Sequence, residues 1–121
     1  DHGAGAIDLL PEIVAAVAGR AEVVVDGGFY RGADIVKAVA LGARAVGLGR
    51  IYGLGLGAAG ESGVHRVLEL LAEEIRITTG LLGYTALDQL GPHCLRQASP
   101  AYESHAFASA FPHWTMHERE Y

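Results

Sequence analysis

The chain has 121 residues, which is enough for one small domain, and half of them are apolar. Its formal net charge of −5 argues against nucleic-acid binding, which usually needs a basic face. No apolar run reaches the roughly 18 residues that cross a membrane. The single Cys94 excludes an internal disulfide, so we expect a protein of the reducing cytoplasm.

The first predicted element is a helix over residues 7–18, followed by Gly19 as a stop. Pro11 lies near its first turn, so this helix is expected to begin one or two residues later. Residues 23–25 are three valines, which predict a short strand buried on both faces, as in a parallel sheet. The apolar side of the helix is formed by Ile7, Leu10, Ile13, Val14 and Val17.

The same order then repeats. Residues 32–41 predict a second helix that ends at Gly42, and residues 45–48 predict a second buried strand. A glycine-rich stretch over 53–60 is expected to lead into a long helix over about 61–79. The expected inner stripe of that helix consists of Val64, Val67, Leu68, Leu71, Ile75 and Thr78.

Helices that alternate with buried strands indicate βα units and a parallel sheet, so the fold class is α/β. Two strands alone leave both sheet edges open, and they cannot make a stable sheet. The chain also opens abruptly on Asp1 without an initiator Met. We therefore expect it to begin in mid-protein and to pair with more protein, either the rest of the same polypeptide or a companion chain.

The pattern weakens after about Gly80, where residues 85–90 predict only a short turn of helix. We expect a first unit over residues 1–98 and a C-terminal tail over 99–121. The tail is expected to cover another protein surface, because its aromatic side chains would otherwise be exposed. These are Tyr102, Phe107, Phe111, Trp114 and Tyr121, which stand among His105, His113 and His117.

Two loops carry the chemistry, and both follow the carboxyl ends of predicted parallel strands. The first is Asp-Gly-Gly-Phe-Tyr-Arg-Gly over 26–32, and the second is Gly-Leu-Gly-Arg over 47–50. Glycine lets backbone N–H groups approach a phosphate, a helix N-terminus adds a favourable dipole, and Arg50 adds a charged contact. Either loop alone is usually only a turn, but two on consecutive βα units favour a phosphate site.

Four segments in this order and spacing are similar to the FMN-dependent 2-hydroxy-acid oxidase and dehydrogenase family. They are IDLLPEIV (7–14), VVDGG (24–28), RGADIVKAVALGA (31–43) and VGLGR (46–50). That family includes glycolate oxidase, lactate oxidase, lactate monooxygenase and mandelate dehydrogenase, and the resemblance covers about residues 1–90. It implies strands seven and eight of a TIM (β/α)8 barrel, which another chain or an N-terminal part completes and the long helix closes.

The resemblance also implies an enzyme that uses FMN to oxidise an L-2-hydroxy acid, such as lactate, glycolate or mandelate, to the 2-oxo acid. Family members are often tetramers, so a homo-oligomer is expected. The Asp-Gly-Gly loop and the Gly-Arg pair hold the FMN phosphate in the family. The cofactor-binding residues expected here are Asp26, Gly27, Gly28, Tyr30, Arg31, Gly49 and Arg50.

Two positions depart from the family pattern. Tyr30 stands where the family usually has a basic residue, and Ile51 stands where it tends to have proline. A tyrosine hydroxyl can donate to phosphate, but it brings no charge. Tyr30 therefore leaves open a non-catalytic barrel that has lost flavin, and another FMN- or nucleotide-phosphate-binding barrel, such as those related to IMP dehydrogenase, is a third possibility.

The family's catalytic base is a histidine followed by Gly-Gly and a substrate-binding arginine, and His2-Gly3 suggests that motif. The register argues against it, because residues 2–6 match the short spacer that precedes the Ile-Asp of the helix. Asp1 then matches the aspartate before that spacer. The catalytic base and the substrate arginine are expected upstream of Asp1, and His2 is expected to be a loop histidine.

The remaining candidates have plainer explanations. His65 is expected on the surface or in the packing of the long helix, and Cys94 as a buried or neutral thiol. His113 and His117 share a helical spacing, but the intervening Trp114 indicates packing, and no metal site is predicted. Asp34 and Lys37 are expected on a solvated helix face.

Overall fold

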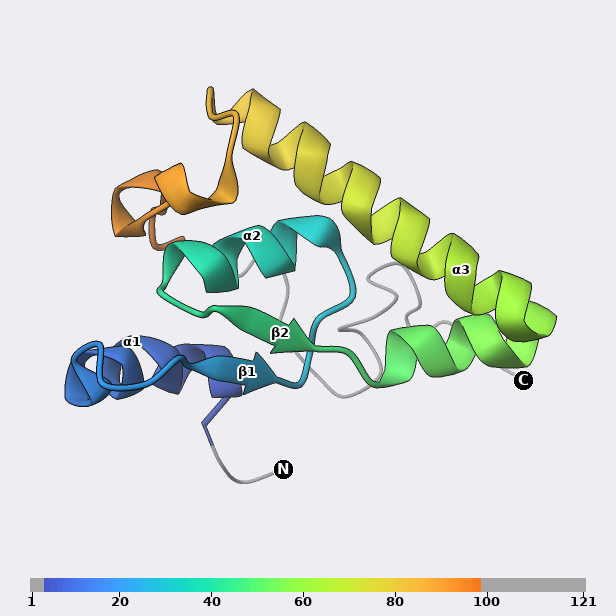
Figure 1. Ribbon diagram of the computed structural model, residues 1–121, viewed down its shortest axis with the longest axis horizontal. Helices are drawn as coiled ribbons and strands as arrows, with labels where there is room; N and C mark the ends of the chain where they lie inside the picture. Colours follow the sequence, from blue (N-terminus) through green and yellow to red (C-terminus); the bar gives the residue numbers. More distant parts are fainter. Residues whose placement is uncertain (1–3, 99–121) are drawn as a thin grey trace, which may run out of the picture.

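The computed structural model describes residues 4–98, so the prediction for the tail and the assignment of His2 lie outside the described residues. The order of elements agrees with the predicted alternation of helices and strands (Figure 1). None of the described helices is long and apolar enough to cross a bilayer. The elements are α1 (Ala6–Val17), β1 (Val24–Asp26), α2 (Gly32–Ala40), β2 (Ala45–Gly47), α3 (Arg50–Leu81) and two 3-10 turns, Leu87–Gln89 and Pro92–Cys94.

The two strands pair in parallel, which confirms the predicted α/β class. Val25 lies opposite Val46, and Asp26 lies opposite Gly47. Both arrows in Figure 1 therefore point the same way, and the chain leaves both strands at the same edge of the sheet. The loop after β1 leads to α2, and the loop after β2 leads to α3. The two glycine-rich loops consequently meet at one edge.

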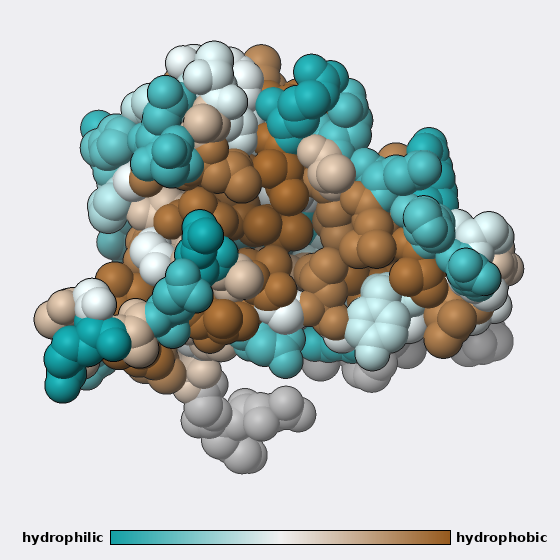
Figure 2. Space-filling model, viewed as in Figure 1, coloured by the Kyte–Doolittle hydropathy of each residue, from teal (hydrophilic) through white to brown (hydrophobic). Residues whose placement is uncertain are grey.

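A small apolar core joins α1, α2 and the sheet. Its buried members include Leu10, Val25 and Phe29, with the alanines of α2 packed against them. Within the described residues β1 is buried on one face only, because Val25 is 6% exposed and Val24 is 62% exposed. The helices cover one face of the sheet, and successive strand residues point to opposite faces. Figure 2 shows apolar side chains gathered across the middle of this view.

Helix α1 begins earlier than predicted and contains Pro11. Its first turn forms at Gly5, whose carbonyl oxygen accepts from the Asp8 N–H at 3.0 Å. Proline has no N–H, so within a helix it removes the bond to the carbonyl four residues earlier, here that of Ile7. The helix tolerates this single loss and ends at Val17, followed by the C-cap residue Ala18 with a positive φ of 50°.

The predicted long helix over about 61–79 corresponds to the second arm of α3, but the glycine-rich stretch before it is also helical, because α3 already begins at Arg50. Non-helical angles occur only at Ala59 and Gly60, where the helix kinks and the chain turns back (Figure 1). The glycines allow the two arms to touch: a Cβ on Gly55 would lie 2.7 Å from the Gly63 carbonyl oxygen. Close packing of the two arms across the kink, rather than loop flexibility, explains why this stretch contains so many glycines.

The long arm of α3 packs on α2 along part of the predicted stripe. Leu71 is buried as predicted, whereas Leu68 is 49% exposed and Thr79, which was not predicted, is buried. The closest approach of the two helices is at Gly32. A Cβ there would lie 2.5 Å from the Glu74 Cβ and 2.6 Å from the Ile75 backbone nitrogen. Only glycine lets the start of α2 approach α3 this closely.

We expect the Gly32→Ala substitution to destabilise the full chain, purified with any polypeptide that accompanies it, by about 1–3 kcal/mol, because the added methyl group has to push two helices apart. The urea midpoint at constant m-value measures the change. The matched control is Gly57→Ala, since Gly57 lies in the first arm of α3 with no neighbour within 4 Å of its Cβ position. That control should be neutral or stabilising by up to about 1 kcal/mol. Equal midpoints for the two variants would contradict the close approach at Gly32.

Candidate functional site

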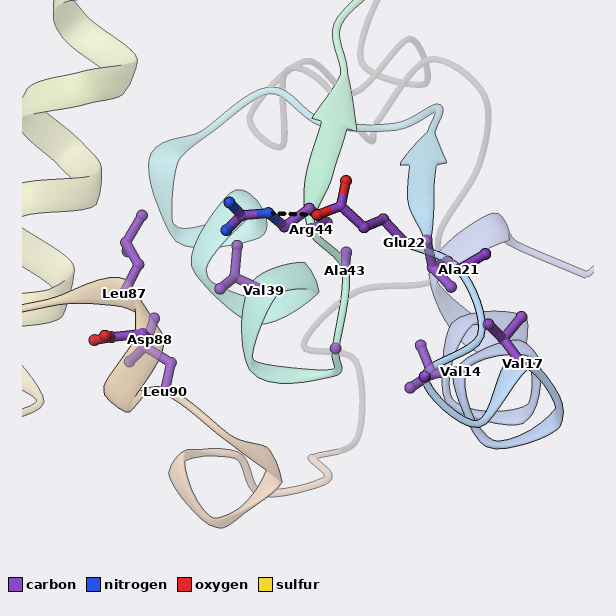
Figure 3. A pocket seen from close by; sticks show the side chains of 13 residues that line it. Val14, Val17, Ala21, Glu22, Val39, Ala43, Arg44, Leu87, Asp88 and Leu90 are labelled. Carbon is purple, nitrogen blue, oxygen red and sulfur yellow. Dashed lines mark hydrogen bonds and ion pairs between the residues drawn. The ribbon is translucent and has the colours of Figure 1, made fainter.

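The two ends of the sheet differ in chemistry. At the amino ends of the strands, the structure has a pocket lined by apolar side chains of α1, α2 and the first 3-10 turn, among them Val14, Val39 and Leu87 (Figure 3). Its charged groups include Arg44 and Glu22, which pair with each other at 3.2 Å. Ligand sites of parallel α/β sheets form at the carboxyl ends of the strands instead. The candidate site is therefore at the opposite edge.

At the carboxyl edge, side chains leave parts of the backbone uncovered. Gly27 and Gly28 have φ values of 106° and 84°, which side chains of L-residues rarely adopt. A Cβ on Gly27, Gly28 or Gly49 would meet no atom within 4 Å. Asp26 and Gly47 touch across the strands, since a Cβ on Gly47 would lie 2.6 Å from an Asp26 carboxylate oxygen. This edge exposes backbone to any group that approaches it.

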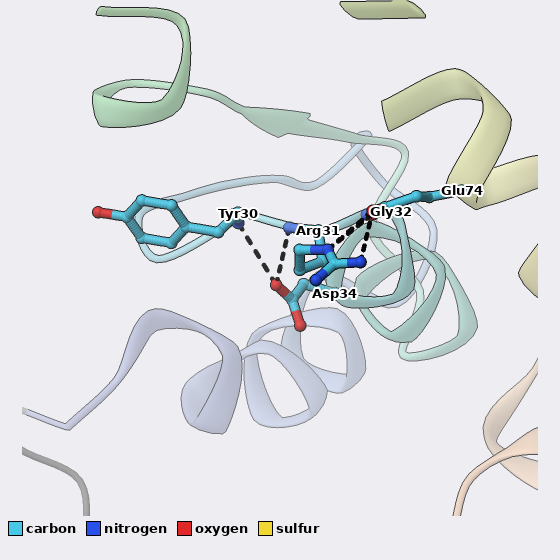
Figure 4. Close-up of polar contacts among 5 residues, drawn as sticks. All are labelled: Tyr30, Arg31, Gly32, Asp34 and Glu74. Atoms are coloured by element: carbon cyan, nitrogen blue, oxygen red, sulfur yellow. Dashed lines mark hydrogen bonds and ion pairs between the residues drawn. The ribbon is translucent and has the colours of Figure 1, made fainter. Parts of the chain in front are cut away.

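The N-terminus of α2, next to the first loop, is filled by acidic side chains of the chain. The Asp34 Oδ2 atom accepts from the backbone N–H of Tyr30 at 3.3 Å and of Arg31 at 3.1 Å (Figure 4). A Glu74 carboxylate oxygen accepts from the Gly32 N–H at 2.6 Å. Carboxylates thus already occupy the N–H groups of Tyr30, Arg31 and Gly32, and their negative charge opposes a second anion at this helix start.

Arg31 belongs to the same cluster. Its Nε donates to Glu74 Oε1 at 2.8 Å, and its Nη2 lies 2.6 Å from that oxygen. The hydrogen bond from Arg31, together with the Gly32 N–H, lowers the pKa of Glu74 below its usual value. We call Arg31, Gly32 and Glu74 the α2–α3 clamp. The clamp directs this guanidinium to α3.

The N-terminus of α3 is different, because within residues 4–98 nothing caps it. Gly49 has no side chain, and the first backbone bond runs from the Gly53 N–H to the Gly49 carbonyl at 3.2 Å. Among the described residues, the N–H groups of Arg50, Ile51 and Tyr52 find no acceptor. Unpaired donors at the positive end of a helix dipole form a natural anion site.

Arg50 stands at this helix start without an acidic partner in the described part of the chain. Its guanidinium carbon lies 5.6 Å from the centroid of the Tyr30 ring, within the range of a cation–π contact. Every other arginine or lysine among residues 4–98 has an oxygen partner, whether a carboxylate or a backbone carbonyl. These are Arg20, Arg31, Lys37, Arg44, Arg66, Arg76 and Arg96.

Residues 1–97 match the family described as FMN-dependent dehydrogenase. The chain belongs to this family. The match covers both strands, the glycine-rich loops that follow them and the whole of α3. It agrees with the resemblance carried by the four sequence segments.

Named relatives agree with this membership. The chain is 47% identical to an L-lactate oxidase from Nostoc sp. over 90 residues, which is 74% of this chain and 25% of that protein. It is 54% identical to a 4-hydroxymandelate oxidase from Amycolatopsis orientalis over 83 residues, 69% of this chain and 23% of that protein. A solved mandelate oxidase variant with a monooxide FMN adduct aligns with a TM-score of 0.70 and 51% identity, covering 73% of this chain and 28% of that one. The chain spans about a quarter of the length of these curated relatives.

The structure brings most of the predicted site residues of this family member to one edge. Asp26, Gly27 and Gly28 lie on the first loop, with Tyr30 beside Arg50 of the second. Arg31 makes a different contact, in the α2–α3 clamp. Whether these residues hold a phosphate stays a prediction.

The sequence interpretation missed two acidic residues. Asp34 was expected on a solvated helix face, but it caps the N-terminus of α2. An acidic residue three positions after a helix start is a recognisable signal for such a cap. Glu74 had no comparable signal, because it lies 42 residues from the Gly32 N–H that it accepts. Of the other candidates, His65 is exposed on α3, and Cys94 is a half-buried free thiol.

We expect Glu74→Gln to destabilise the full chain, purified with any polypeptide that accompanies it, by about 1 kcal/mol, because the amide keeps an acceptor for Gly32 but loses the charge that pairs with Arg31. Glu73→Gln is the matched control, since Glu73 pairs with Arg76 of its own helix at 2.6 Å. The control should change the urea midpoint less. If Glu73→Gln lowers the stability as much as Glu74→Gln does, the α2–α3 clamp contributes no more than an ordinary surface ion pair.

The same carboxylate predicts a pH dependence. A lowered folded-state pKa means that Glu74 adds stability above the ordinary value of 4.5, and that this stability is lost as the pH falls through the lowered pKa. Urea midpoints of the unaltered chain and of Glu74→Gln should therefore differ at neutral pH and converge in acid. A difference that stays constant down to pH ~2–3 would mean that ionisation of Glu74 is not the cause.

Proposed function

We propose that this chain holds the phosphate of FMN in an enzyme that oxidises an L-2-hydroxy acid, such as lactate, glycolate or mandelate, to the 2-oxo acid. The observation that carries the proposal is the start of α3. There, unpaired backbone donors, an arginine without an acidic partner in residues 4–98 and open glycines lie together. The relatives named as lactate and 4-hydroxymandelate oxidases support the substrate class.

The residues present fit a phosphate dianion. The N–H groups of Arg50, Ile51 and Tyr52 supply donors, and the Arg50 guanidinium supplies charge in a fork that suits two phosphate oxygens. The N-terminus of α2 suits a phosphate less well, because Asp34 and Glu74 accept from the N–H groups of Arg31 and Gly32 there, and their carboxylates would repel it. The phosphate is therefore assigned to the start of α3, with the backbone of Gly27 and Gly28 beside it.

Asp26 suits another part of the cofactor. A carboxylate repels a phosphate, yet Asp26 lies at the same edge, against Gly47. The ribityl chain of FMN carries hydroxyl groups next to its phosphate, and a carboxylate accepts hydrogen bonds from hydroxyls. Asp26 is accordingly assigned to these hydroxyls.

The two strands require further strands. Each has a neighbour on one side only among the described residues, and Val24 exposes 62% of its surface. A parallel pair with an open apolar face is stable only when more protein covers it. We assign β1 and β2 to strands seven and eight of a TIM barrel. The other strands, from the same polypeptide or a companion chain, would supply the catalytic base and the substrate arginine.

Bound FMN would accept the reducing equivalents of the hydroxy acid. The contribution of this chain is to position the cofactor. A phosphate bound at a rigid helix start would fix one end of the flavin. Binding energy from this remote group would then help to position the reacting atoms of flavin and substrate. The α2–α3 clamp anchors the end of the first loop to α3.

The experiment compares FMN with riboflavin, which lacks the phosphate, on the full chain together with any polypeptide that co-purifies with it. Equilibrium dialysis should show FMN bound more tightly than riboflavin. Arg50→Ala should weaken FMN binding about ten- to hundredfold, the worth of a hydrogen bond to a charged group, and leave riboflavin unchanged. The control Arg44→Ala should change neither, because Arg44 lies at the opposite end of the strands.

Equal affinities for the two flavins would contradict a phosphate site. No binding of either flavin, with the barrel complete, would support the alternative of a non-catalytic barrel that has lost its cofactor.

A further inference from the structure

Tyr30 and Arg50 meet across the two glycine-rich loops. The Arg50 guanidinium carbon lies 5.6 Å from the centroid of the Tyr30 ring, and the two residues come from different βα units. Tyr30 is half-buried and Arg50 is exposed. This contact is therefore a link between the loop after β1 and the start of α3.

The backbone on both sides of Tyr30 is fixed. Phe29 before it is only 5% exposed in the apolar core, and Arg31 after it is held by Glu74. The Tyr30 N–H itself donates to Asp34 at 3.3 Å. Figure 4 shows the Tyr30 side chain extending away from Asp34 and Glu74, with its hydroxyl at the far end. The ring is thus carried on an anchored piece of chain.

The chain holds its two loop arginines in opposite ways. Glu74 takes both the charge and the donor groups of Arg31, since its oxygens lie 2.6 Å from Nη2 and 2.8 Å from Nε. An aromatic face attracts the cation through its quadrupole and accepts no strong hydrogen bond from the guanidinium edge. The ring therefore restrains Arg50 and leaves its planar N–H fork free for an anion.

We propose that Tyr30 is a positioning residue for Arg50, holding the guanidinium ready for the phosphate at the start of α3. The inference rests on the proposed function and deepens it. An arginine without a partner has a large rotamer entropy to lose when it binds, and a restrained one loses less. Tyr30 acts here through its ring, and its hydroxyl is not required.

The test is a double-mutant cycle with a conservative variant. Tyr30→Leu removes the ring, Tyr30→Phe keeps it, and each is made with Arg50 intact and with Arg50→Ala. Dissociation constants for FMN and riboflavin are measured on the full chain with any co-purifying polypeptide, and urea midpoints confirm folding. Tyr30→Leu should weaken FMN binding about two- to fivefold, the worth of an exposed cation–π contact. Tyr30→Phe should match the unaltered protein, and riboflavin should be unaffected throughout.

With Arg50→Ala already present, Tyr30→Leu should cause no further loss. A loss in Tyr30→Phe as large as in Tyr30→Leu would overturn the proposal in favour of the hydroxyl. A loss of FMN affinity from Tyr30→Leu that persists in the Arg50→Ala background would also overturn the proposal.

A spectroscopic readout separates this inference from the proposed function. Nuclear magnetic resonance of the flavin-free protein should show ring-current shifts of the Arg50 side-chain protons that persist in Tyr30→Phe and vanish in Tyr30→Leu. If Arg50→Ala weakens FMN binding and Tyr30→Leu does not, the positioning role is overturned and the proposed function stands. If FMN is bound no better than riboflavin, the proposed function fails, and the role of Tyr30 toward phosphate fails with it.

Discussion

The hydrogen bond between the Glu74 carboxylate and the Gly32 N–H is the contact on which the site depends. It joins the start of α2 to the long arm of α3 at a point where only glycine fits, and Arg31 closes it from the other side. The first loop is then held at one end by Phe29 in the core and at the other by α3. A loop with two left-handed glycines would otherwise be free to move, since glycine loses more conformational entropy than any other residue on ordering.

This contact also makes the two helix starts unequal. Both follow a parallel strand, and both would attract an anion through their free N–H groups. At α2, carboxylates of the chain accept from the N–H groups of Arg31 and Gly32, and at α3 the chain supplies no such acceptor within residues 4–98. The same division separates the two arginines, so that Arg31 serves the fold and Arg50 remains available. The two helix starts therefore differ as anion sites because the chain already pairs N–H donors at α2 and, in its described part, leaves those at α3 unpaired.

The sequence predicted the parts of this molecule that local pattern controls. The alternation of helices with short apolar strands predicted α1, both strands, α2 and the long arm of α3, and the glycines at 27 and 28 predicted an open loop. Pattern failed where a distant partner decides. No helix was predicted over the glycine-rich stretch 53–60, because nothing in the local pattern shows that Gly55 packs against Gly63 across a kink. The role of Arg31 depended on Glu74, which lies 43 residues away.

Tyr30 replaces the basic residue that the family usually has at this position, and the two side chains act on a phosphate in different ways. A basic residue at this position would hold a phosphate by adding a second charge, whereas a ring beside Arg50 adds none and restrains the charge already there. Attraction between exposed charges weakens with ionic strength, while short backbone hydrogen bonds at a helix start are screened far less. A site with one cation therefore relies more on the directed N–H groups of α3. Phosphate binding at such a site would depend on the start of α3, a helix whose arms pack against each other at Gly55 and Gly63 and against α2 at Gly32.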